Sequence, residues 1–334
     1  MRRVAWFVGR DDIDRLFGDS SVGLRDCIDA VERSFREHGE GNVGVLPRHI
    51  LTADGGVPQP RSRALKLSAS FMRASKVMGA SIYSTHFRPG DVDMWLMVFS
   101  GESGDLAGIL HGKTLSLWKT GATSAVAARH LARADASRVA LIGTGYYAKA
   151  QLQCLAADRS LAEVRCYSRD DGRVAAFVDW ARSMFTSTKV VAAGSAEEAV
   201  RGADIVVTIT TSPHPVVRGA WLDGGVHVNA IGQHAPGARE IDTEAIVKAR
   251  VIVDAREQAL QEKGEILIPV SEGAITPSHI VGELGEVVAG RVKGRTRDHD
   301  MTVFCSGGTA LEYMGLCELL VARARDAGIG KTLD

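Results

Sequence analysis

The residues with the clearest chemical meaning form a glycine-rich turn near the middle of the chain. An apolar run that starts at Val139 breaks into Gly143-Thr-Gly145-Tyr-Tyr-Ala148, and a helical pattern follows. In a dinucleotide-binding β-α unit, the first glycine permits a tight turn, the second lets the backbone approach a pyrophosphate, and a small third residue lets the helix close on the strand. Such turns also occur without a ligand, but a second strand pattern at 163–167 favours nucleotide binding. The predicted contacts are Gly143, Thr144, Gly145, Tyr146, Tyr147 and Ala148.

The end of the second strand pattern bears on the choice of cofactor. An NAD enzyme usually places Asp or Glu there for the ribose 2′-OH, whereas this chain reads Ser168-Arg169 before Asp170-Asp171. Ser168 would leave a 2′-phosphate unopposed and Arg169 could bind it, which slightly favours NADP(H). Either aspartate could instead turn to the ribose, and Arg169 could stack on adenine. The prediction is therefore NAD(H) or NADP(H), with Ser168 and Arg169 as contacts.

A third group of polar residues ends a later strand pattern. Thr208, Thr210 and Thr211 stand at what would be the carboxyl edge of a parallel sheet, where ligands bind in open α/β folds. Their hydroxyl groups could contact the cofactor ribose, or they could satisfy only the backbone of the loop.

Composition narrows the class of protein. A chain of 334 residues is longer than a single hydrophobic core usually accommodates, which predicts two domains. Lys and Arg equal Asp and Glu at 40 each, without a polybasic run, so neither nucleic acid nor an anionic membrane is an expected partner. Five scattered cysteines without ligand spacing predict reduced thiols and no metal. No apolar stretch reaches the ~20 residues of a membrane span, and the sequence predicts a cytoplasmic enzyme.

The chain shows two different secondary-structure patterns, one on each side of about residue 138. From about 138 to 304, strand and helix patterns alternate, which predicts an α/β fold with a doubly wound parallel sheet. Strands are expected near 139–142, 163–167, 189–193, 204–210, 226–231 and 250–253. Before this region, a helix near 23–38 precedes β-like runs at 45–51, 64–70, 78–84, 94–100 and 106–111. A helix-forming stretch at 121–133 leads into the α/β region, and a last helical segment is expected to return to the first domain. The predicted domains are 1–134 plus 309–334, and 135–308.

Several separate motifs, in order, resemble the ornithine cyclodeaminase/mu-crystallin family along nearly the whole chain. They are Leu46-Pro-Arg48, Ser103-Gly-Asp-Leu-Ala-Gly-Ile-Leu-His111, the glycine turn, Asn229-Ala-Ile-Gly232, Arg239-Glu-Ile-Asp242, Val253-Asp254, Gly264-Glu265 and Thr302-Val-Phe-Cys-Ser306-Gly-Gly308. The resemblance implies a Rossmann NAD(P)-binding domain, a domain for substrate binding and dimerisation, and a homodimer. It implies NAD(P)-dependent chemistry at a carbon bearing an amino or imino group. It also places Asn229, Gly232 and Ser306 to Gly308 at the nicotinamide.

Departures from the family pattern bear on the substrate. Ser81 stands where the family has a lysine that contacts the substrate carboxylate, and Lys119 replaces an arginine. Lysine lacks the bidentate fork of arginine, so the second change is not neutral. Arg48 keeps its place. We therefore expect Arg48 first and Lys119 second to hold a carboxylate, with Ser81 and Gly308 nearby; the alternative is that both cations lie on the surface.

Two acids of the family pattern are also replaced. His234 stands where cyclodeaminases carry an aspartate that assists cyclisation, and Tyr313 replaces a second aspartate. A histidine can donate a proton to an imine nitrogen or accept one from an ammonium. His234 is therefore the predicted acid/base, unless it only caps a loop. The remaining candidates near the site are neutral or basic: Arg48, His86, Arg88, His111, Lys119 and His234.

These residues predict an NAD(P)H-dependent reductase of a small 2-imino acid, reversible as an amino-acid dehydrogenase. One hypothesis within this interpretation is a dicarboxylic substrate, with iminosuccinate reduced to aspartate. Arg48 and Lys119 would orient the carboxylate and His234 would handle the proton. Two alternatives stay open: a cyclodeaminase that releases ammonia from ornithine or lysine, and a non-catalytic protein that binds NADP and a small ligand.

Overall fold

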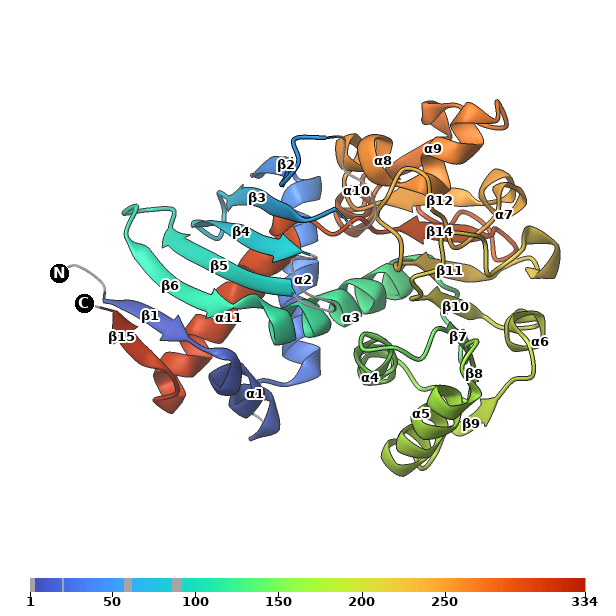
Figure 1. The fold of residues 1–334 in the computed structure, drawn as a ribbon, viewed down its shortest axis with the longest axis horizontal. Helices are drawn as coiled ribbons and strands as arrows, with labels where there is room; N and C mark the ends of the chain where they lie inside the picture. The colour runs from blue at the N-terminus through green and yellow to red at the C-terminus, as the bar shows by residue number, and fades with distance from the viewer. Residues whose placement is uncertain (1–3, 20, 57–61, 86–91, 334) are drawn as a thin grey trace. The chain divides into compact units, whose positions relative to one another are not determined.

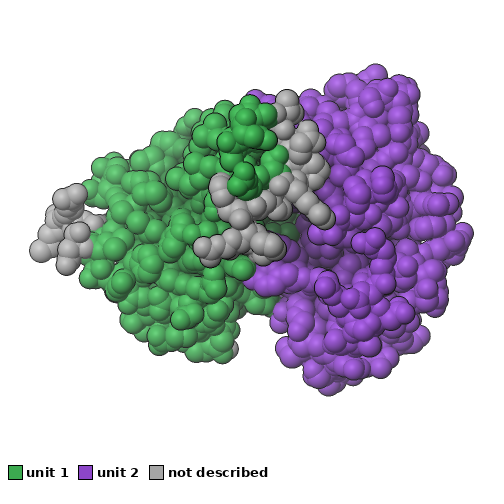
Figure 2. All heavy atoms as spheres, viewed as in Figure 1, with its two compact units in different colours: residues 1–123, 308–334 green, residues 124–307 purple. Residues whose placement is uncertain are grey.

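The computed structural model describes residues 4–19, 21–56, 62–85 and 92–333. The chain divides into two compact units, coloured separately in Figure 2: Met1–Thr123 with Gly308–Asp334 (unit 1), and Ser124–Gly307 (unit 2). The division falls inside helix α3 (Gly112–Leu131), whereas the sequence pattern placed it at 134. The candidates His86 and Arg88 lie outside the described residues.

Unit 1 is built on a mixed seven-stranded sheet. Its strand order is β15-β1-β6-β5-β4-β3-β2, with β1 parallel to β6 and the pairs from β6 to β2 antiparallel. The strands are β1 (Ala5–Val8), β2 (Val43–Thr52), β3 (Ala64–Met72), β4 (Val77–Thr85), β5 (Val92–Ser100), β6 (Leu106–His111) and β15 (Lys331–Leu333). The register of β2 and β3 shifts between Leu46 and His49, and this irregularity contains Arg48.

Helices cover one face of that sheet. They are α1 (Arg10–Gly18), α2 (Leu24–Gly39) and α11 (Ala310–Ala327), and α11 packs on both α2 and the central strands (Figure 1). Two glycines admit α11 to the sheet: a Cβ on Gly79 would lie 2.7 Å from Met314 Sδ, and one on Gly108 would lie 2.8 Å from a Val321 methyl group. Residues that alternate with Gly79 along β4 therefore face α11, and those between them face away.

Unit 2 contains an eight-stranded sheet in which every pair of neighbours is parallel. The order is β13-β12-β14-β11-β10-β7-β8-β9, which places the glycine-turn strand β7 between β10 and β8. The strands are β7 (Arg138–Ile142), β8 (Glu163–Tyr167), β9 (Lys189–Ala192), β10 (Ile205–Thr208), β11 (His227–Ala230), β12 (Arg250–Val253), β13 (Ile280–Glu283) and β14 (Thr302–Cys305). Chain order reverses direction at β7, as in a dinucleotide-binding fold. The predicted α/β fold class is confirmed.

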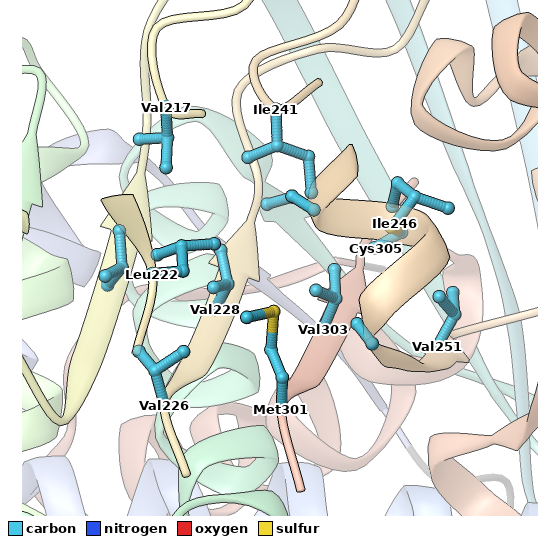
Figure 3. Close-up of a cluster of buried hydrophobic side chains, with 14 of the residues drawn as sticks. Val217, Leu222, Val226, Val228, Ile241, Ile246, Val251, Met301, Val303 and Cys305 are labelled. Carbon is cyan, nitrogen blue, oxygen red and sulfur yellow. The ribbon is translucent and has the colours of Figure 1, made fainter. Parts of the chain in front are cut away.

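Two apolar cores lie on the two faces of this sheet, because its strands are buried on both sides. On one face, Val228, Val251 and Val303 form a cluster with Ile241, Ile246 and Met301 (Figure 3). On the other, Leu141, Val164 and Val207 pack with residues of helices α4 and α5. The helices of this unit are α4 (Ala148–Asp158), α5 (Asp171–Met184), α6 (Ala196–Val200), α7 (Thr243–Lys248), α8 (Arg256–Glu262), α9 (Gly264–Ser271) and α10 (Leu284–Val288), with short 3₁₀ turns η1 (Gly219–Trp221) and η2 (Pro277–His279).

The linker helix α3 is longer than the sequence pattern indicated. We expected a helix over 121–133, but α3 begins at Gly112, so Lys119 lies on it rather than before it. Small and polar residues are spread over all sides of α3. The helix therefore has no single apolar stripe, and its first part shows no helical periodicity in the sequence. Among the described residues, no helix has the length and apolar character needed to cross a membrane.

Candidate functional site

The glycine turn of unit 2 has the form that a pyrophosphate requires. Gly143 follows β7 with a φ of 107°, and a Cβ there would lie 2.6 Å from the carbonyl oxygen of Ile209, so a larger residue would collide with backbone. A Cβ on Gly145 would meet no atom of the described residues within 4 Å, which leaves this side of the turn open. Helix α4 then starts at the buried Ala148. The turn therefore fits a dinucleotide, with backbone N–H groups available to phosphate oxygens.

The other residues of the turn lie around this cradle. Thr144 has a buried hydroxyl oxygen that lacks a hydrogen-bond partner among the described residues. Tyr146 is 55% exposed, and its ring meets that of Tyr147 edge-on, with 5.3 Å between the centroids.

Some of the polar groups that follow β8 already form hydrogen bonds within the protein. The Asp170 carboxylate caps α5 by accepting the N–H of Arg173 at 3.0 Å, and it forms an exposed ion pair with that side chain at 3.3 Å. The Ser168 hydroxyl accepts the Asp170 N–H at 3.3 Å. Capping engages Asp170 with the helix, so Ser168, Arg169 and Asp171 are the other residues at the strand end that could meet the 2′ position of a ribose.

A buried carboxylate joins the ends of β10 and β11. Glu240 accepts hydrogen bonds from the Thr208 hydroxyl at 2.9 Å, the Thr210 N–H at 2.6 Å and the Gly232 N–H at 2.6 Å. The side chain of Glu240 is fully buried, and burial together with the nearby Glu265 carboxylate raises its pKa to about 7. Thr208 is therefore buried against Glu240, whereas Thr210 is half-buried and Thr211 is exposed.

A second pair of buried charges supports the same loop. The Lys263 ammonium donates to the carbonyl oxygen of Gln233 at 2.5 Å and lies 3.2 Å from the Glu265 carboxylate. Burial opposes the charge of Lys263, but the Glu265 carboxylate together with Cys305 and Glu240 outweighs this, and the pKa of Lys263 is raised. Glu265 also accepts the N–H of Glu240 at 3.0 Å. These bonds hold the backbone at Gln233, directly before His234, and at Glu240, further along the same loop.

His234 lies on the exposed side of that loop, between the buried residues Gln233 and Ala235. The Gln233 amide donates to the Ser212 carbonyl oxygen at 2.7 Å and so ties the loop to the segment after β10. An imidazole on a fixed backbone and open to solvent can exchange a proton with a ligand.

Asn229 and Ser306 are buried in hydrogen-bond networks of unit 2. The Asn229 amide donates to the Ser124 carbonyl oxygen at 3.2 Å, and its oxygen pairs with the ring of His227 at 3.1 Å. Burial lowers the pKa of His227 to about 3, so this histidine is neutral. The Ser306 hydroxyl donates to Asp254 at 3.1 Å, and the same carboxylate accepts the Gly307 N–H at 2.7 Å. Asp254 thus fixes the turn that follows β14.

In unit 1, two predicted cations meet at the start of α11. The Arg48 guanidinium donates to the carbonyl oxygen of Gly308 at 2.6 Å. Gly308 has a φ of 73°, and a Cβ on it would lie 3.1 Å from the Lys119 ammonium and 3.7 Å from the Arg48 guanidinium. The structure therefore brings Arg48, Lys119 and Gly308 together beside the first turn of a helix, where a carboxylate is favoured.

The charge of Lys119 is offset by an acid that the sequence analysis missed. Its ammonium donates to Glu312 at 2.7 Å and lies 4.9 Å from the centre of the Tyr313 ring. Lys119 is 5% exposed and Glu312 is fully buried. Glu312 also accepts the Thr123 hydroxyl at 2.9 Å and the Thr309 N–H at 3.0 Å. The ionised groups Arg48, Lys119 and Glu312 together carry one positive charge.

Ser81 and His111 make other contacts within unit 1. The Ser81 hydroxyl pairs with that of Ser68 across β3 and β4 at 2.8 Å, and Ser81 is 1% exposed. His111 packs edge-on against Trp95, with ring centroids 5.1 Å apart, and burial lowers its pKa. A neutral His111 gains little from Asp93 at 3.8 Å, since an ion pair needs a protonated ring.

Some signals for the missed residues are present in the sequence. Thr309 and Glu312 have the spacing of a capping box, which predicts a helix start but not a bond to Lys119. Glu240 and Glu265 belong to motifs quoted for the family resemblance, yet spacing alone does not reveal that they meet. Their partners come from segments that only the folded sheet brings together.

The sequence and the fold are similar to those of known proteins. The model of the ornithine cyclodeaminase/mu-crystallin family matches residues 19–327. A Δ1-pyrroline-2-carboxylate reductase of Bacillus cereus is 35% identical over 240 residues, which are 72% of this chain and 73% of the relative. The resemblance predicted from the sequence is confirmed.

Two solved structures have the same fold as this chain over nearly its whole length. The Thermococcus litoralis Δ1-pyrroline-2-carboxylate reductase in complex with NADH and L-proline has a TM-score of 0.89 and 28% identity, and the match covers 98% of this chain and 100% of that one. An archaeal alanine dehydrogenase dimer with bound NAD has a TM-score of 0.89 and 27% identity, with 99% of each chain covered. The predictions of a nicotinamide cofactor and of an oxidoreductase acting on carbon–nitrogen bonds are confirmed.

Proposed function

Because the chain belongs to the ornithine cyclodeaminase/mu-crystallin family, we propose that it reduces the C=N bond of a small 2-imino acid to the L-amino acid with NAD(P)H. The reverse reaction, as an amino-acid dehydrogenase, uses the same groups. The observation that carries this proposal is the meeting of Arg48, Lys119 and Gly308 at the start of α11 in a chain whose other unit contains the open glycine turn.

The charge at this cluster favours a substrate with a single carboxylate. Arg48 and Lys119 contribute two positive charges, and Glu312 at 2.7 Å from Lys119 removes one of them. A dicarboxylate such as iminosuccinate would bring a second negative charge to a cluster with one net positive charge. A cyclic or short monocarboxylic imine matches the cluster better, and the Δ1-pyrroline-2-carboxylate reductases to which the chain is similar are named for such an imine.

Each unit supplies different groups. In unit 2, Gly143 to Ala148 would hold the cofactor pyrophosphate, and Ser168 and Arg169 would meet the adenosine ribose. When bound, the nicotinamide supplies or accepts the hydride. In unit 1, Arg48 would hold the substrate carboxylate with Lys119 beside it. His234 would give a proton to the imine nitrogen during reduction and take one from the ammonium in reverse.

We also favour NADPH over NADH. Asp170 accepts the Arg173 N–H and is thereby committed to capping α5. The hydroxyl of Ser168 and the guanidinium of Arg169 lie at the end of β8, where they could accept a 2′-phosphate, and Asp171 at the start of α5 is a nearby acid that would oppose it.

We further propose a homodimer formed through the face of the unit 1 sheet that turns away from α11. Leu51 pairs with Leu65 in register, Leu46 pairs with Ala69, and Ile82 pairs with Leu67, so these side chains share that face. Leu46, Leu51, Leu65 and Ile82 are 43%, 60%, 41% and 38% exposed. An apolar surface of this kind marks an interface. Sedimentation of wild type and of Leu65→Asp tests it, with a monomeric variant expected and an unchanged mass contradicting the interface.

A substrate panel tests the catalytic proposal. Oxidation of NADPH and NADH is followed by absorbance with Δ1-pyrroline-2-carboxylate, with pyruvate plus ammonia, and with oxaloacetate plus ammonia. We expect turnover of a monocarboxylic imine. Turnover of oxaloacetate plus ammonia alone would restore the dicarboxylate hypothesis. Ammonia release from ornithine without net change in cofactor absorbance would establish a cyclodeaminase, and cofactor binding without any turnover would establish a binding protein.

His234→Ala separates the proton-transfer role from a loop-capping role. We expect kcat to fall about 100-fold, within the usual range for a lost acid/base group, while cofactor affinity changes little. An unchanged kcat would remove His234 from the mechanism.

A further inference from the structure

The Glu240 carboxylate lies where three segments of unit 2 converge. Thr208 ends β10, Thr210 begins the segment after it, and Gly232 follows β11, and each donates a hydrogen bond to Glu240. β10 lies directly between β7, which carries the glycine turn, and β11. Glu240 therefore acts on the carboxyl ends of two adjacent strands, the edge at which ligands bind in this fold.

Close backbone packing connects this carboxylate to the nucleotide turn. A Cβ on Gly232 would lie 2.3 Å from the Thr210 carbonyl oxygen and 2.6 Å from a Glu240 carboxylate oxygen. A Cβ on Gly143 would lie 2.6 Å from the carbonyl oxygen of Ile209, the residue before Thr210. A shift of the Thr210 backbone would therefore change the contacts of Gly143 on one side and of Gly232 on the other.

The chemistry of the three donors requires an acceptor. Two of them are backbone N–H groups, which can only donate, and both oxygens of the Glu240 carboxyl group keep lone pairs that can accept, whether or not the group carries its proton. A neutral amide in its place would turn an NH₂ group toward one of these donors. The interior disfavours the charge, since burial and the Glu265 carboxylate both raise the pKa of Glu240. The charged groups near it, Glu265 and Lys263, come from the segment at the start of α9.

We propose that Glu240 is a positioning residue, which holds the backbone after β10 and the Gly232 to His234 segment in the arrangement that hydride transfer needs. This role rests on the proposed reductase function. Glu240 reaches the ligands through Thr210 and Gly232 and does not itself meet them. The adjacent amide of Gln233, which donates to Ser212 at 2.7 Å, closes the same two segments at a second point.

The chain offers a matched control at the other end of the same strand. Asp204 precedes β10, is 3% exposed, and accepts the backbone N–H groups of Ser137 at 3.1 Å and Arg138 at 2.9 Å. It therefore resembles Glu240 in burial and in accepting two backbone N–H groups, but it lies at the amino end of the sheet and also forms ion pairs with Arg133 at 2.8 Å and Arg138 at 3.1 Å. A purely structural role predicts the same consequences for Glu240→Gln and Asp204→Asn.

The experiment compares these two variants with wild type in three measurements. They are kcat on the substrate found by the panel, the Kd of NADPH from its fluorescence, and hydrogen exchange of peptides that cover 208–212 and 230–234. For Glu240→Gln we expect kcat to fall between about 10- and 100-fold, as for a misplaced reacting group. We expect the Kd to change less than about threefold and both peptides to exchange faster. Asp204→Asn should lower the unfolding temperature and leave kcat and these peptides unchanged.

Two results would overturn the proposal. One is a folded Glu240→Gln variant with wild-type kcat, and the other is a loss of kcat that Asp204→Asn reproduces. If Glu240→Gln does not fold, Glu240→Asp keeps the charge but withdraws it by one methylene, and the same measurements apply. If wild type reduces no imino acid, the proposed function fails, and hydrogen exchange then decides separately. NADPH should slow exchange at 208–212 and 230–234 in wild type but not in the variant, and equal slowing in both would overturn the proposal.

Discussion

The buried ion pair between Lys119 and Glu312 gives the sharpest quantitative test. Both groups are nearly or fully buried, and their charged atoms lie 2.7 Å apart. Removing one partner of such a pair leaves an uncompensated charge and costs about 3–5 kcal/mol of stability, whereas removing both is far milder. We expect Lys119→Met and Glu312→Gln each to lose about 3–5 kcal/mol, and the double variant to lose much less than the sum.

Glu312→Gln is a suitable probe because glutamine keeps the capping box that begins α11. Chemical denaturation of the four proteins yields the coupling energy of the pair. Losses that add within about 0.5 kcal/mol would refute the view that Glu312 neutralises Lys119. The same variant tests substrate charge. With the acid removed, the ratio of kcat/KM for a dicarboxylic over a monocarboxylic imine should rise about tenfold, equivalent to about 1.4 kcal/mol.

Three further outcomes follow from the geometry. Arg48→Lys keeps the charge but loses the guanidinium that reaches the Gly308 carbonyl oxygen, so KM for the imino acid should rise about tenfold, with a smaller change in kcat. Initial-rate kinetics measure both constants. Equal KM values for the variant and wild type would exclude Arg48 as the carboxylate ligand. Ser168→Asp would face a 2′-phosphate with a carboxylate, so kcat/KM should fall at least about tenfold with NADPH and less with NADH; equal losses with both cofactors would contradict the assignment. For Glu240, the folded pKa is about 7 against an ordinary 4.5, so the folded state keeps a proton that the unfolded chain releases. Its contribution to stability is present below pH 4.5 and is lost as the pH rises through 7, by about 3 kcal/mol, a decline that unfolding curves should show in wild type and not in Glu240→Gln.

Patterns of short range predicted much of the fold. The strand expected at 163–167 has the bounds of β8, and the strand expected at 139–142 differs from β7 by one residue at its start, because strand patterns are local signals. The short strands β1 and β15 and helix α1 were not predicted. β1 pairs with β6 and β15, from distant parts of the sequence, and its four residues are too few for a periodic pattern.

The site was predictable in its residue types but not in its pairings. The glycine turn, and Arg48 and Lys119 as candidate residues, could be inferred from spacing and resemblance. The partner of Lys119 could not, because Glu312 follows it by 193 positions and only the packing of α3 and α11 in unit 1 brings them together. Glu240 is a similar case, since its three donors come from 208 to 232 and meet it only after β10 and β11 have paired.

The order of the two units along the chain has a consequence for biosynthesis. Unit 2 is encoded between the two parts of unit 1, so all of its strands leave the ribosome before α11 does. Domains generally fold as units during synthesis, N-terminal ones first. Here the first-made sheet must wait for its last helix, and its α11-facing side, with Gly79 and Gly108 shaped to receive Met314 and Val321, stays exposed meanwhile. We therefore expect nascent unit 1 to need chaperones most in the interval before α11 has been synthesised.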